Sequence, residues 1–513
     1  MSDIKSTDTT NLNQSGKPRV RFAPSPTGYL HVGSLRTALY NYLFAKKHGG
    51  TYVLRIEDTD QSRLVEDAME RLVRSLAHMG VNADEGVLLD GELVVEKGEY
   101  GPYQQSHRLS IYRQYVDELV AQGKAYPCFC TAERLDTMRK EMTANKQAPK
   151  YDKHCANLAE EDVKALLDAE APHVIRFNVT PGEDIVFTDL VRGEVKINTK
   201  EVDDQVLLKS DGFPTYHLAV VVDDHLMGIT HILRSEEWLP STPKHILLYK
   251  AFGWKMPEIG HVSVILGPDG KKKLSKRDGG ASVDEFLEKG YLEEVLINFL
   301  VLLGWNPGGG STQEIFSLSE LESIFDLKGL HKAGAVFDHK KLDWMNSAYI
   351  KAMPLDELYN RIEKGGWFAK DLVQFAPTDM QTKEYLLKVL AVEQERLVRL
   401  DMFGEENPFF FQLELSYDKG ILAWKQNTEE MTREALEKAF AIIEKFTDAE
   451  WVDKAYIESV LLEAAGDKKG DFLWPLRVAL TGAERSPSPF EVLYVLGKDH
   501  SLERIVRALA MLR

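Results

Sequence analysis

Apolar and polar positions near the start of the chain predict a strand, a helix and a second strand. Residues 19–23 (RVRFA) form a short β-type run, which residues 24–28 (PSPTG) end. Beyond this turn, apolar residues recur at the spacing of one helix face, at Leu35, Ala38, Leu39, Tyr42 and Leu43. A glycine pair at 49–50 ends the helix, and residues 51–56 (TYVLRI) form the next strand. This order is a βαβ unit, and ligands of open α/β sheets bind at the carboxyl ends of the strands.

The pattern then predicts an insertion that divides the sheet into two halves. Residues 107–122 form a strong helix, and short strands and turns fill residues 173–199. Strand character resumes at residues 206–209, and residues 231–234 are typical of a buried strand. The nearly continuous apolar run from Tyr216 to Val222 suits either a helix or a strand that is buried on both sides.

The last part of the chain is predicted to be helical. An apolar, β-branched segment at residues 262–266 precedes a basic loop, residues 271–280 (KKKLSKRDGG). Helical patterns dominate beyond this loop, and those from Pro354 onward are amphipathic. The predicted fold class is therefore α/β, with a Rossmann-type parallel sheet, an α+β insertion and an all-α C-terminal half.

Composition is that of a soluble globular protein in a reducing compartment. The chain has 513 residues, 44% hydrophobic and 28% charged, and no apolar run long enough to span a membrane. Such a length predicts about three to five domains. Residues 1–17 are polar, so we expect a disordered tail and no secretory signal. Three cysteines are too few for a disulfide framework, which favours a cytoplasmic location.

Net charge changes the expected partners only a little. The formal charge of −17 makes nucleic acid a less obvious partner. It does not exclude one, because net charge governs solubility and long-range steering, whereas binding needs only one basic face.

Two distant segments suit a polyphosphate. His31–Ser34 (HVGS) lies at the predicted start of a helix, where backbone N–H groups and positive potential favour phosphate. Lys273–Arg277 (KLSKR) is a basic loop that can stabilise charge developing on a phosphate. Alone, the first is most often a simple turn and the second a solvated face. Their order is more informative, because one follows the first strand of the sheet and the other follows the last.

With these two segments the chain resembles the class I aminoacyl-tRNA synthetases, whose signatures are usually written HIGH and KMSKS. The flanking text is similar to that of the bacterial-type glutamyl-tRNA synthetase family from about residue 18 to the end. The stretches that carry this resemblance are Arg21–Gly28 (RFAPSPTG), Arg55–Asp60 (RIEDTD), Asp211–Leu218 (DGFPTYHL), Val222–His225 (VDDH), Arg234–Trp238 (RSEEW) and Pro475–Arg477 (PLR).

The resemblance implies roles for individual residues. It implies catalytic roles for His31, Lys273 and Lys276, ATP contacts from His31, Gly33, Ser34, Lys276 and Arg277, and glutamate contacts from Arg21, Ala23, Ser25, Glu57, Tyr216 and Arg234. Guanidinium groups pair with carboxylates in a planar, bidentate way, and Glu57 suits the substrate ammonium. Without this context, Arg21 is an exposed strand-end charge and Tyr216 a core aromatic. Val220 departs from relatives that carry an asparagine facing the substrate there.

The implied reaction has two steps. Glutamate attacks the α-phosphate of ATP, bound with Mg²⁺, to give glutamyl-adenylate and pyrophosphate, and the terminal ribose hydroxyl of tRNA-Glu then accepts the glutamyl group. We expect a monomer that binds no membrane. The resemblance leaves open whether tRNA-Gln is also glutamylated.

The same resemblance implies a domain division and tRNA contacts. The division is 1–17 tail, 18–110 and 206–260 as halves of the catalytic domain, 111–205 as the acceptor-binding insertion, 261–345 as the stem-contact region with the KMSKS-type loop, and 346–513 as the anticodon-binding domains. Arg396 falls where relatives read the third anticodon base, although an exposed helix arginine is an equal alternative. Pro475–Arg477 matches the family text but has an alternative role in packing.

Cys128, Cys130 and Cys155 are similar to the zinc-binding cysteines of some relatives. A structural zinc site needs four ligands, and the position two after Cys155, where a fourth is expected, is Asn157. Tyr151 and His154 remain alternatives for the fourth ligand. The competing interpretation is a relic of the site with three reduced thiols.

Other functions fit less well. Glutaminyl-tRNA synthetases usually have a β-barrel anticodon region, and the short paralogues that modify a tRNA base lack the C-terminal half. A catalytically inactive RNA-binding relative is expected to lose His31 or Lys276, and both are present. A nucleotidylyltransferase without an RNA partner needs no further helical domains of about 250 residues.

Overall fold

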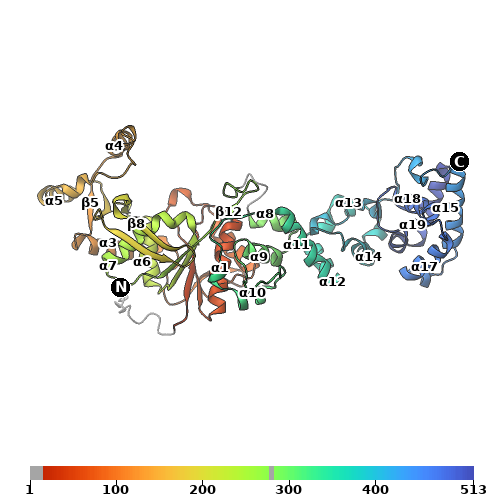
Figure 1. Ribbon diagram of the computed structural model, residues 1–513, viewed down its shortest axis with the longest axis horizontal. Helices are drawn as coiled ribbons and strands as arrows, with labels where there is room; N and C mark the ends of the chain where they lie inside the picture. Colours follow the sequence, from red (N-terminus) through yellow and green to blue (C-terminus); the bar gives the residue numbers. More distant parts are fainter. Residues whose placement is uncertain (1–15, 276–281) are drawn as a thin grey trace. The chain divides into compact units, whose positions relative to one another are not determined.

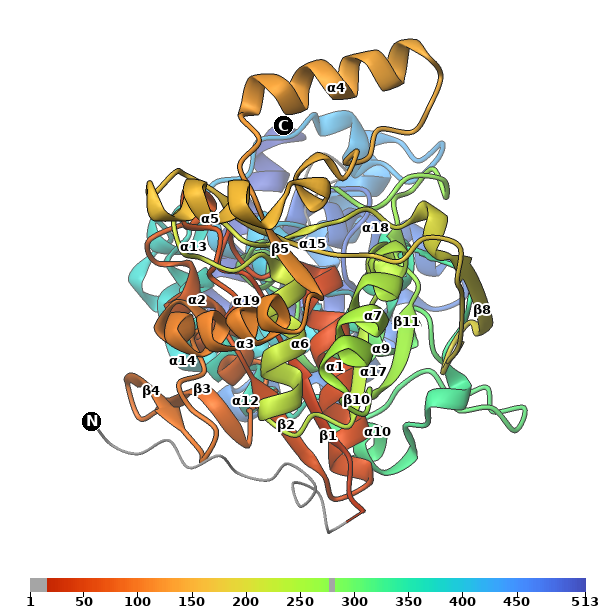
Figure 2. The same ribbon diagram turned by 90° about the vertical axis from the view of Figure 1, so that its left-hand side faces the viewer.

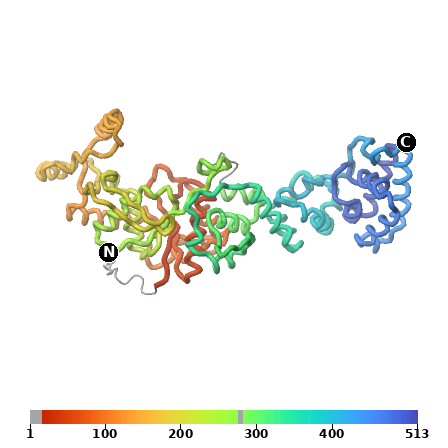
Figure 3. Tube along the Cα trace, viewed as in Figure 1, coloured from red at the N-terminus to blue at the C-terminus, as the bar shows by residue number. Residues whose placement is uncertain are grey.

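The computed structural model describes residues 16–275 and 282–513, which form two compact units (Figures 1 and 3). The first holds the described residues up to Leu287 and Glu293–Asp338, and the second holds Glu288–Leu292 and His339–Arg513. Within the described ranges, no helix is long and apolar enough to cross a membrane. The predicted division into smaller domains stays a prediction. Its boundary after residue 345 falls inside helix α11 (His339–Ala352), and the second unit contains that whole helix.

The first unit is built on a largely parallel sheet in two parts. One part has the order β1 (Arg19–Phe22), β2 (Thr51–Leu54), β3 (Glu85–Asp90), β4 (Leu93–Lys97), and the other β10 (His231–Ser235), β11 (Glu258–Val262), β7 (Asp184–Asp189), β8 (Gly193–Asn198). The hairpins β3–β4 and β7–β8 are antiparallel, and the other pairs are parallel. The parts meet at β1 and β10, where Thr230 N donates to Arg19 O at 2.8 Å (Figure 2).

Helices and a second, smaller sheet complete the first unit. The helices are α1 (Val32–Lys47), α2 (Ala68–His78), α3 (Leu109–Ala121), α4 (Ala132–Ala144), α5 (Glu160–Asp168), α6 (Tyr216–Leu226), α7 (Thr242–Phe252), α8 (Val283–Glu288), α9 (Glu293–Leu302) and α10 (Leu318–Ile324). Helix α1 joins the parallel strands β1 and β2, which confirms the predicted βαβ unit. The segment left open between helix and strand is helical, as α6, and its apolar residues 218–222 pack in a core with α3 and α7.

The segment predicted as an insertion contributes strands to two different sheets. Strands β5 (Ala125–Cys128), β6 (Val174–Phe177) and β9 (Val206–Leu208) form their own antiparallel sheet, near which α4 and α5 lie at the margin of the unit (Figure 1). Strands β7 and β8, which also lie between residues 111 and 205, instead extend the main sheet through the pair Asp189 and Ile259. Local sequence patterns do not specify pairing between segments this far apart.

The predicted strand at residues 262–266 is divided. Strand β11 ends at Val262, and β12 (Ile265–Leu266) pairs with β13 (Ala335–Val336). Leu274 N donates to Ile265 O at 2.9 Å, so the start of the basic loop folds back along β12. This contact places Lys273 beside β12.

The second unit is helical, as predicted. Its helices are α11, α12 (Leu355–Lys364), α13 (Asp371–Gln374), α14 (Lys383–Glu393), α15 (Glu429–Ile443), α16 (Asp448–Trp451), α17 (Lys454–Ala465), α18 (Lys469–Thr481) and α19 (Pro489–Met511). Buried Arg504 in α19 donates to the carbonyls of Phe409 and Gln412 at 2.7 and 2.6 Å. A side chain at Gly470 would meet Trp424 Nε1 at 2.4 Å, which explains a glycine there by packing.

Candidate active site

One cavity of about 840 Å³ lies at the carboxyl ends of β1 and β10. It is of the size that small-molecule sites commonly have. The residues predicted to be catalytic or to bind ATP or glutamate that line it are Arg21, Ala23, Ser25, His31, Gly33, Ser34, Glu57, Tyr216, Arg234 and Lys273. Lys276 and Arg277, the other two predicted residues, lie outside the described ranges. The cavity therefore brings together two predicted sites that are far apart in the chain.

The start of α1 forms one wall of this cavity. His31 is the N-cap residue of the helix, and its Nδ1 accepts a hydrogen bond from Gly33 N at 3.0 Å. A Cβ on Gly33 would lie 3.2 Å from that nitrogen, so the turn is closely packed against the imidazole. The first turn of α1 contains no acidic residue. Its N-terminus therefore keeps a positive potential, which favours an anion such as a phosphate.

Four buried charged side chains, Arg21, Arg55, Glu57 and Asp224, form a group beside the cavity. Arg21 Nε donates to Asp224 at 3.1 Å, and Arg55 donates to Asp224 Oδ1 at 2.8 Å and to Glu57 Oε1 at 2.9 Å. Burial by itself would raise the pKa of Asp224, but Arg21 and Arg55 outweigh it and hold that pKa below its usual range. Burial raises the pKa of Glu57, although Arg55 and Arg21 oppose the change. The group is thus balanced internally, two cations against two acids.

Arg234 presents a different electrostatic environment in the same cavity. Its guanidinium donates to Tyr216 Oη and to the carbonyl oxygen of Trp238, both at 3.3 Å. The rings of Tyr216 and Trp238 lie 4.3 Å apart between centroids, and both residues line the cavity. Within the part of the chain that the structure describes, Arg234 has no carboxylate partner, whereas Arg21 is paired with Asp224.

Lys273 lies at the rim of the cavity, where it forms an ion pair. Its Nζ lies 2.5 Å from Glu237 Oε2, and both side chains are about half exposed, at 54% and 48%. Exposed ion pairs contribute little to stability, typically below about 1 kcal/mol. The lysine is therefore placed beside the cavity but is not locked there.

Sequence reasoning missed the residues that hold this site in place. Asp223, Asp224 and Arg55 are buried charges that the motif text included without a role, and Arg108 is a buried charge outside those motifs. Arg108 Nε donates to Asp223 at 2.7 Å and so ties α6 to the start of α3. The available signal was the pair of acids directly after an apolar run, in a helix that buries both faces. Val220, the departure from the family text, is a core residue of α6 and does not line the cavity.

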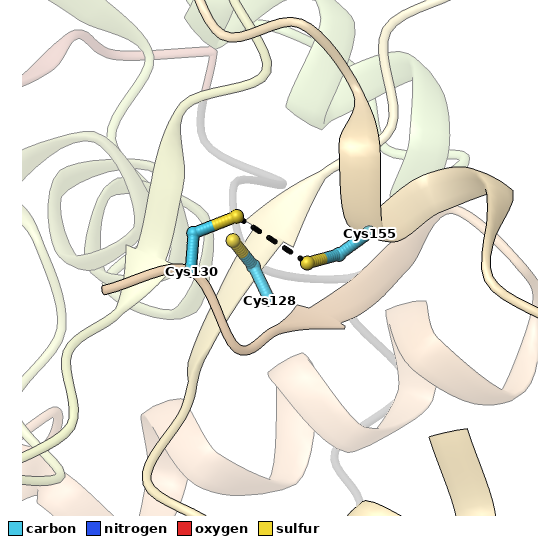
Figure 4. Close-up of side chains that lie close together, drawn as sticks. All are labelled: Cys128, Cys130 and Cys155. Atoms are coloured by element: carbon cyan, nitrogen blue, oxygen red, sulfur yellow. Dashed lines mark hydrogen bonds between the residues drawn. The ribbon is translucent and has the colours of Figure 1, made fainter. Parts of the chain in front are cut away.

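The three cysteines lie together, as the resemblance implied (Figure 4). Their sulfur atoms are within 4.8 Å of one another, and Cys130 Sγ lies 3.5 Å from Cys155 Sγ. Tyr151 Oη lies 3.3 Å from both Cys128 Sγ and Cys130 Sγ. His154 and Asn157 are exposed, and Asn157 donates to a backbone carbonyl. Of the open alternatives, only Tyr151 faces the cysteine cluster.

Arg396 lies in the turn that follows α14, not within the helix. It is exposed, and its guanidinium donates to Val392 O at 3.0 Å. Nearby Glu393 is buried, which raises its pKa to about 7, and it accepts hydrogen bonds from Gly404 N and Asn407 Nδ2.

Comparisons with known proteins give consistent matches along the chain. Residues 17–344 match the family model described as tRNA synthetases class I (E and Q), catalytic domain, and residues 367–509 match an anticodon binding domain. A glutamate–tRNA ligase of Clostridioides difficile is 46% identical over 95% of this chain and 98% of its own length. One from Treponema denticola is 42% identical over 96% and 99%.

Solved structures are similar over nearly the whole chain as well. A crystal structure of a glutamate tRNA ligase from Elizabethkingia meningosepticum in complex with its amino acid has a TM-score of 0.85 and 37% sequence identity, covering 97% of this chain and 100% of that one. A glutamate-tRNA synthetase of Elizabethkingia anophelis has a TM-score of 0.85 and 36% identity, covering 96% and 100%.

Proposed function

This chain belongs to the glutamate–tRNA ligases of the class I tRNA synthetase family, and we propose that its cavity activates L-glutamate with ATP and transfers it to tRNA-Glu. The observation that carries this proposal is the position of the residues around one cavity. The N-terminus of α1, with His31 and Gly33, lines this cavity, and so do Arg234 and Glu57. A nucleotide bound to the first pair and an amino acid bound to the second would meet at the carboxyl ends of β1 and β10.

The ATP side is formed by the start of α1 and the basic loop. We assign the phosphates to His31, Gly33 and Ser34, with Lys273 at the rim, because these supply N–H donors and positive charge. Lys276 and Arg277 keep their predicted roles, and ATP is proposed to enter with Mg²⁺. The glutamate α-carboxylate oxygen attacks the α-phosphorus, and pyrophosphate leaves with the electrons of the broken P–O bond. In such a reaction the protein acts by positioning and by stabilising charge.

The amino-acid side is formed by β1, β2, β10 and the start of α6. We assign the side-chain carboxylate of glutamate to Arg234 and Tyr216, with Arg21 as the second guanidinium. Glu57 is assigned to the ammonium group, and Ala23 and Ser25 to the walls. Among the described residues, the terminal nitrogens of Arg21 have no hydrogen-bond partner, so this fork is available to a ligand although Nε is bound to Asp224.

In the second step the terminal ribose hydroxyl of tRNA attacks the carbonyl carbon of the adenylate and releases AMP. We assign the acceptor end to the segment of residues 111–205, and the anticodon to the helical second unit, with Arg396 as the proposed reader of the third base. The match of residues 367–509 to an anticodon binding domain supports this assignment.

A structural zinc ion is proposed for the cysteine cluster. Three thiols and the phenol of Tyr151 give a donor set of four. Zinc–sulfur bonds of about 2.3 Å place neighbouring sulfurs about 3.8 Å apart, and in this cluster Cys130 Sγ lies 3.5 Å from Cys155 Sγ, with all three sulfurs within 4.8 Å of one another. A bound ion would join residues 128–130 to the turn at 151–155. Metal analysis of purified protein tests this: about one zinc per chain supports the site, and a value near zero supports three reduced thiols.

The main proposal is tested by aminoacylation with labelled glutamate or glutamine, using purified tRNA-Glu and tRNA-Gln separately. Charging of tRNA-Glu with glutamate is expected. Glutamine charging, or no charging of tRNA-Glu, would contradict the proposal. Glutamate on tRNA-Gln would identify a non-discriminating member of the family.

A further inference from the structure

The guanidinium of Arg234 is surrounded by uncharged hydrogen-bond acceptors. A guanidinium has five N–H donors and no acceptor. Here each donor has a neutral partner: His261 Nε2 at 3.0 Å, His245 Nδ1 at 3.1 Å, Thr242 Oγ1 at 2.9 Å, and Tyr216 Oη and Trp238 O at 3.3 Å each. For a side chain that is only 5% exposed, this is unusual, because buried cations are normally paired with acids.

The donor character of Arg234 fixes the protonation of both imidazoles. His261 Nε2 and His245 Nδ1 must each offer a lone pair to the guanidinium, so both rings are neutral. The proton of His261 is then on Nδ1, which donates to Asp189 Oδ2 at 2.5 Å. The proton of His245 is on Nε2, which donates to His217 Nδ1 at 3.1 Å. Each ring is thereby held in one tautomer and one orientation.

The surroundings of these rings agree with the neutral state. Burial lowers the pKa of His245 well below its usual value, and the charge of Arg234 lowers it further. Burial also lowers the pKa of His261, although Asp189 opposes this. The other charged or titratable groups that face the two rings are Arg21, Arg192, His217 and Tyr216, whose ring centroid lies 5.7 Å from that of His245.

The five acceptors fall into two sets. His245, His261 and Thr242 come from α7 and β11, are buried, and do not line the cavity. Their contacts with Arg234 are the shorter ones, between 2.9 and 3.1 Å. Tyr216 and Trp238 line the cavity and make the two longer contacts. On each terminal nitrogen of Arg234, one N–H is therefore bound to a buried residue that does not line the cavity, and the other is bound to a residue that does.

We propose that His245 and His261 are positioning residues that hold Arg234 through uncharged acceptors, so that its full positive charge selects a side-chain carboxylate over an amide. This inference rests on the proposed function, because it concerns the same amino-acid site. A carboxylate behind Arg234 would orient the fork equally well but would cancel its charge, as Asp224 does for Arg21. Glutamate, which is anionic, would then lose its advantage over neutral glutamine.

The test compares two substitutions of the same shape and different charge. His245→Asn and His245→Asp both place an oxygen acceptor near the position of Nδ1, and an aspartate beside Arg234 stays ionised. In ATP–pyrophosphate exchange with tRNA present, His245→Asn is expected to keep the glutamate KM within about threefold, and His245→Asp to raise it by about tenfold or more. The KM for ATP is expected to stay unchanged in both, and the preference for glutamate over glutamine is expected to fall only in His245→Asp.

Equal glutamate KM values for the two variants, whether raised or unchanged, would overturn the inference, because the charge of the acceptor would then have no effect. If both variants fail to fold by circular dichroism, the pair Thr242→Asn and Thr242→Asp applies the same comparison at the third acceptor. A wild-type protein that activates no glutamate would remove the proposed function itself. Equal KM values in a chain that does activate glutamate would remove only the role of the neutral acceptors.

Discussion

Arg21 and Arg234 line one cavity from the neighbouring strands β1 and β10, but their surroundings differ in charge. Arg21 is bound through Nε to Asp224, within a group of two arginines and two acids. Arg234 is bound to imidazole, hydroxyl and carbonyl acceptors. The same residue type therefore has two electrostatic settings: Arg21 balances a buried acid, whereas Arg234 has no acid beside it among the described residues.

The largest expected effect comes from removing one acid from the charged group around Arg21, which should lower the stability of the protein. Asp224→Asn leaves Arg21 and Arg55 with one buried acid fewer, and removing one partner of a buried pair costs about 3–5 kcal/mol. We expect the free energy of unfolding in urea, followed by circular dichroism, to fall by about that amount. The exposed Asp90→Asn is the control and should change it by less than about 0.5 kcal/mol. A similar small change in Asp224→Asn would mean that the four charges do not depend on one another.

The next effect concerns the ligand. Arg234→Met should lower kcat/KM for glutamate by about 100-fold, because the loss of one charge-assisted hydrogen bond costs about 1.5–3 kcal/mol and a factor of 100 corresponds to about 2.7 kcal/mol. Arg21→Met should have a smaller effect on kcat/KM and a larger one on stability, since its charge already balances Asp224. Both are measured by pyrophosphate exchange together with urea unfolding. Equal losses of kcat/KM would show that the two arginines are equivalent in recognition.

The surroundings of Arg234, which include His217, and those of Arg21, which include Asp224, should also lose stability at different pH values on acidification. Burial lowers the pKa of His217 to about 3, and Lys244 and Arg234 add to that change. In the unfolded chain the ring titrates near pH 6.5, so below that pH the unfolded state binds a proton that the folded state does not. Stability then falls by about 1.4 kcal/mol per pH unit for each such ring. The lowered pKa of Asp224 contributes stability that is complete above about pH 4 and is lost only as pH falls further.

The unfolding free energy of the wild-type protein should decline as the pH falls from about 6 to 4. His217→Gln should reduce the slope of this decline by about 1.4 kcal/mol per pH unit, which corresponds to one proton. The exposed His107→Gln is the matched control and should leave the slope unchanged. Urea midpoints at three pH values in this range measure both. An unchanged slope in His217→Gln would show that this ring is protonated in the folded protein.

The smallest expected effect is at the rim. Glu237→Gln removes the partner of Lys273, and because both side chains are about half exposed, stability should change by less than about 1 kcal/mol. The released lysine should lower the KM for ATP by no more than about threefold in pyrophosphate exchange. A large rise in that KM would instead show that Glu237 itself takes part in nucleotide binding.

Local periodicity was sufficient for much of the fold. The apolar face of α1, the strands on either side of it and the helical second unit all follow from residue spacing. The segment that became α6 could not be assigned from its pattern, since an apolar run buried on both sides has no distinguishing period. The pairing of β7 with β11 was not predicted either, because strand partners are chosen by register and packing, which short segments do not encode.

For the site, the sequence, through its resemblance to a known family, indicated which residues line the cavity: the turn at His31, Lys273 and the two arginines. Only the tertiary structure decided what surrounds each arginine. The partner of Arg21 lies 203 positions away on α6, and the rings behind Arg234 come from α7 and β11. In the same way, packing brings Tyr151, and neither His154 nor Asn157, to the three cysteines. The physical reason is that the energy of a buried charge or a metal ligand depends on the nearest groups in space, and those groups come from distant parts of the chain.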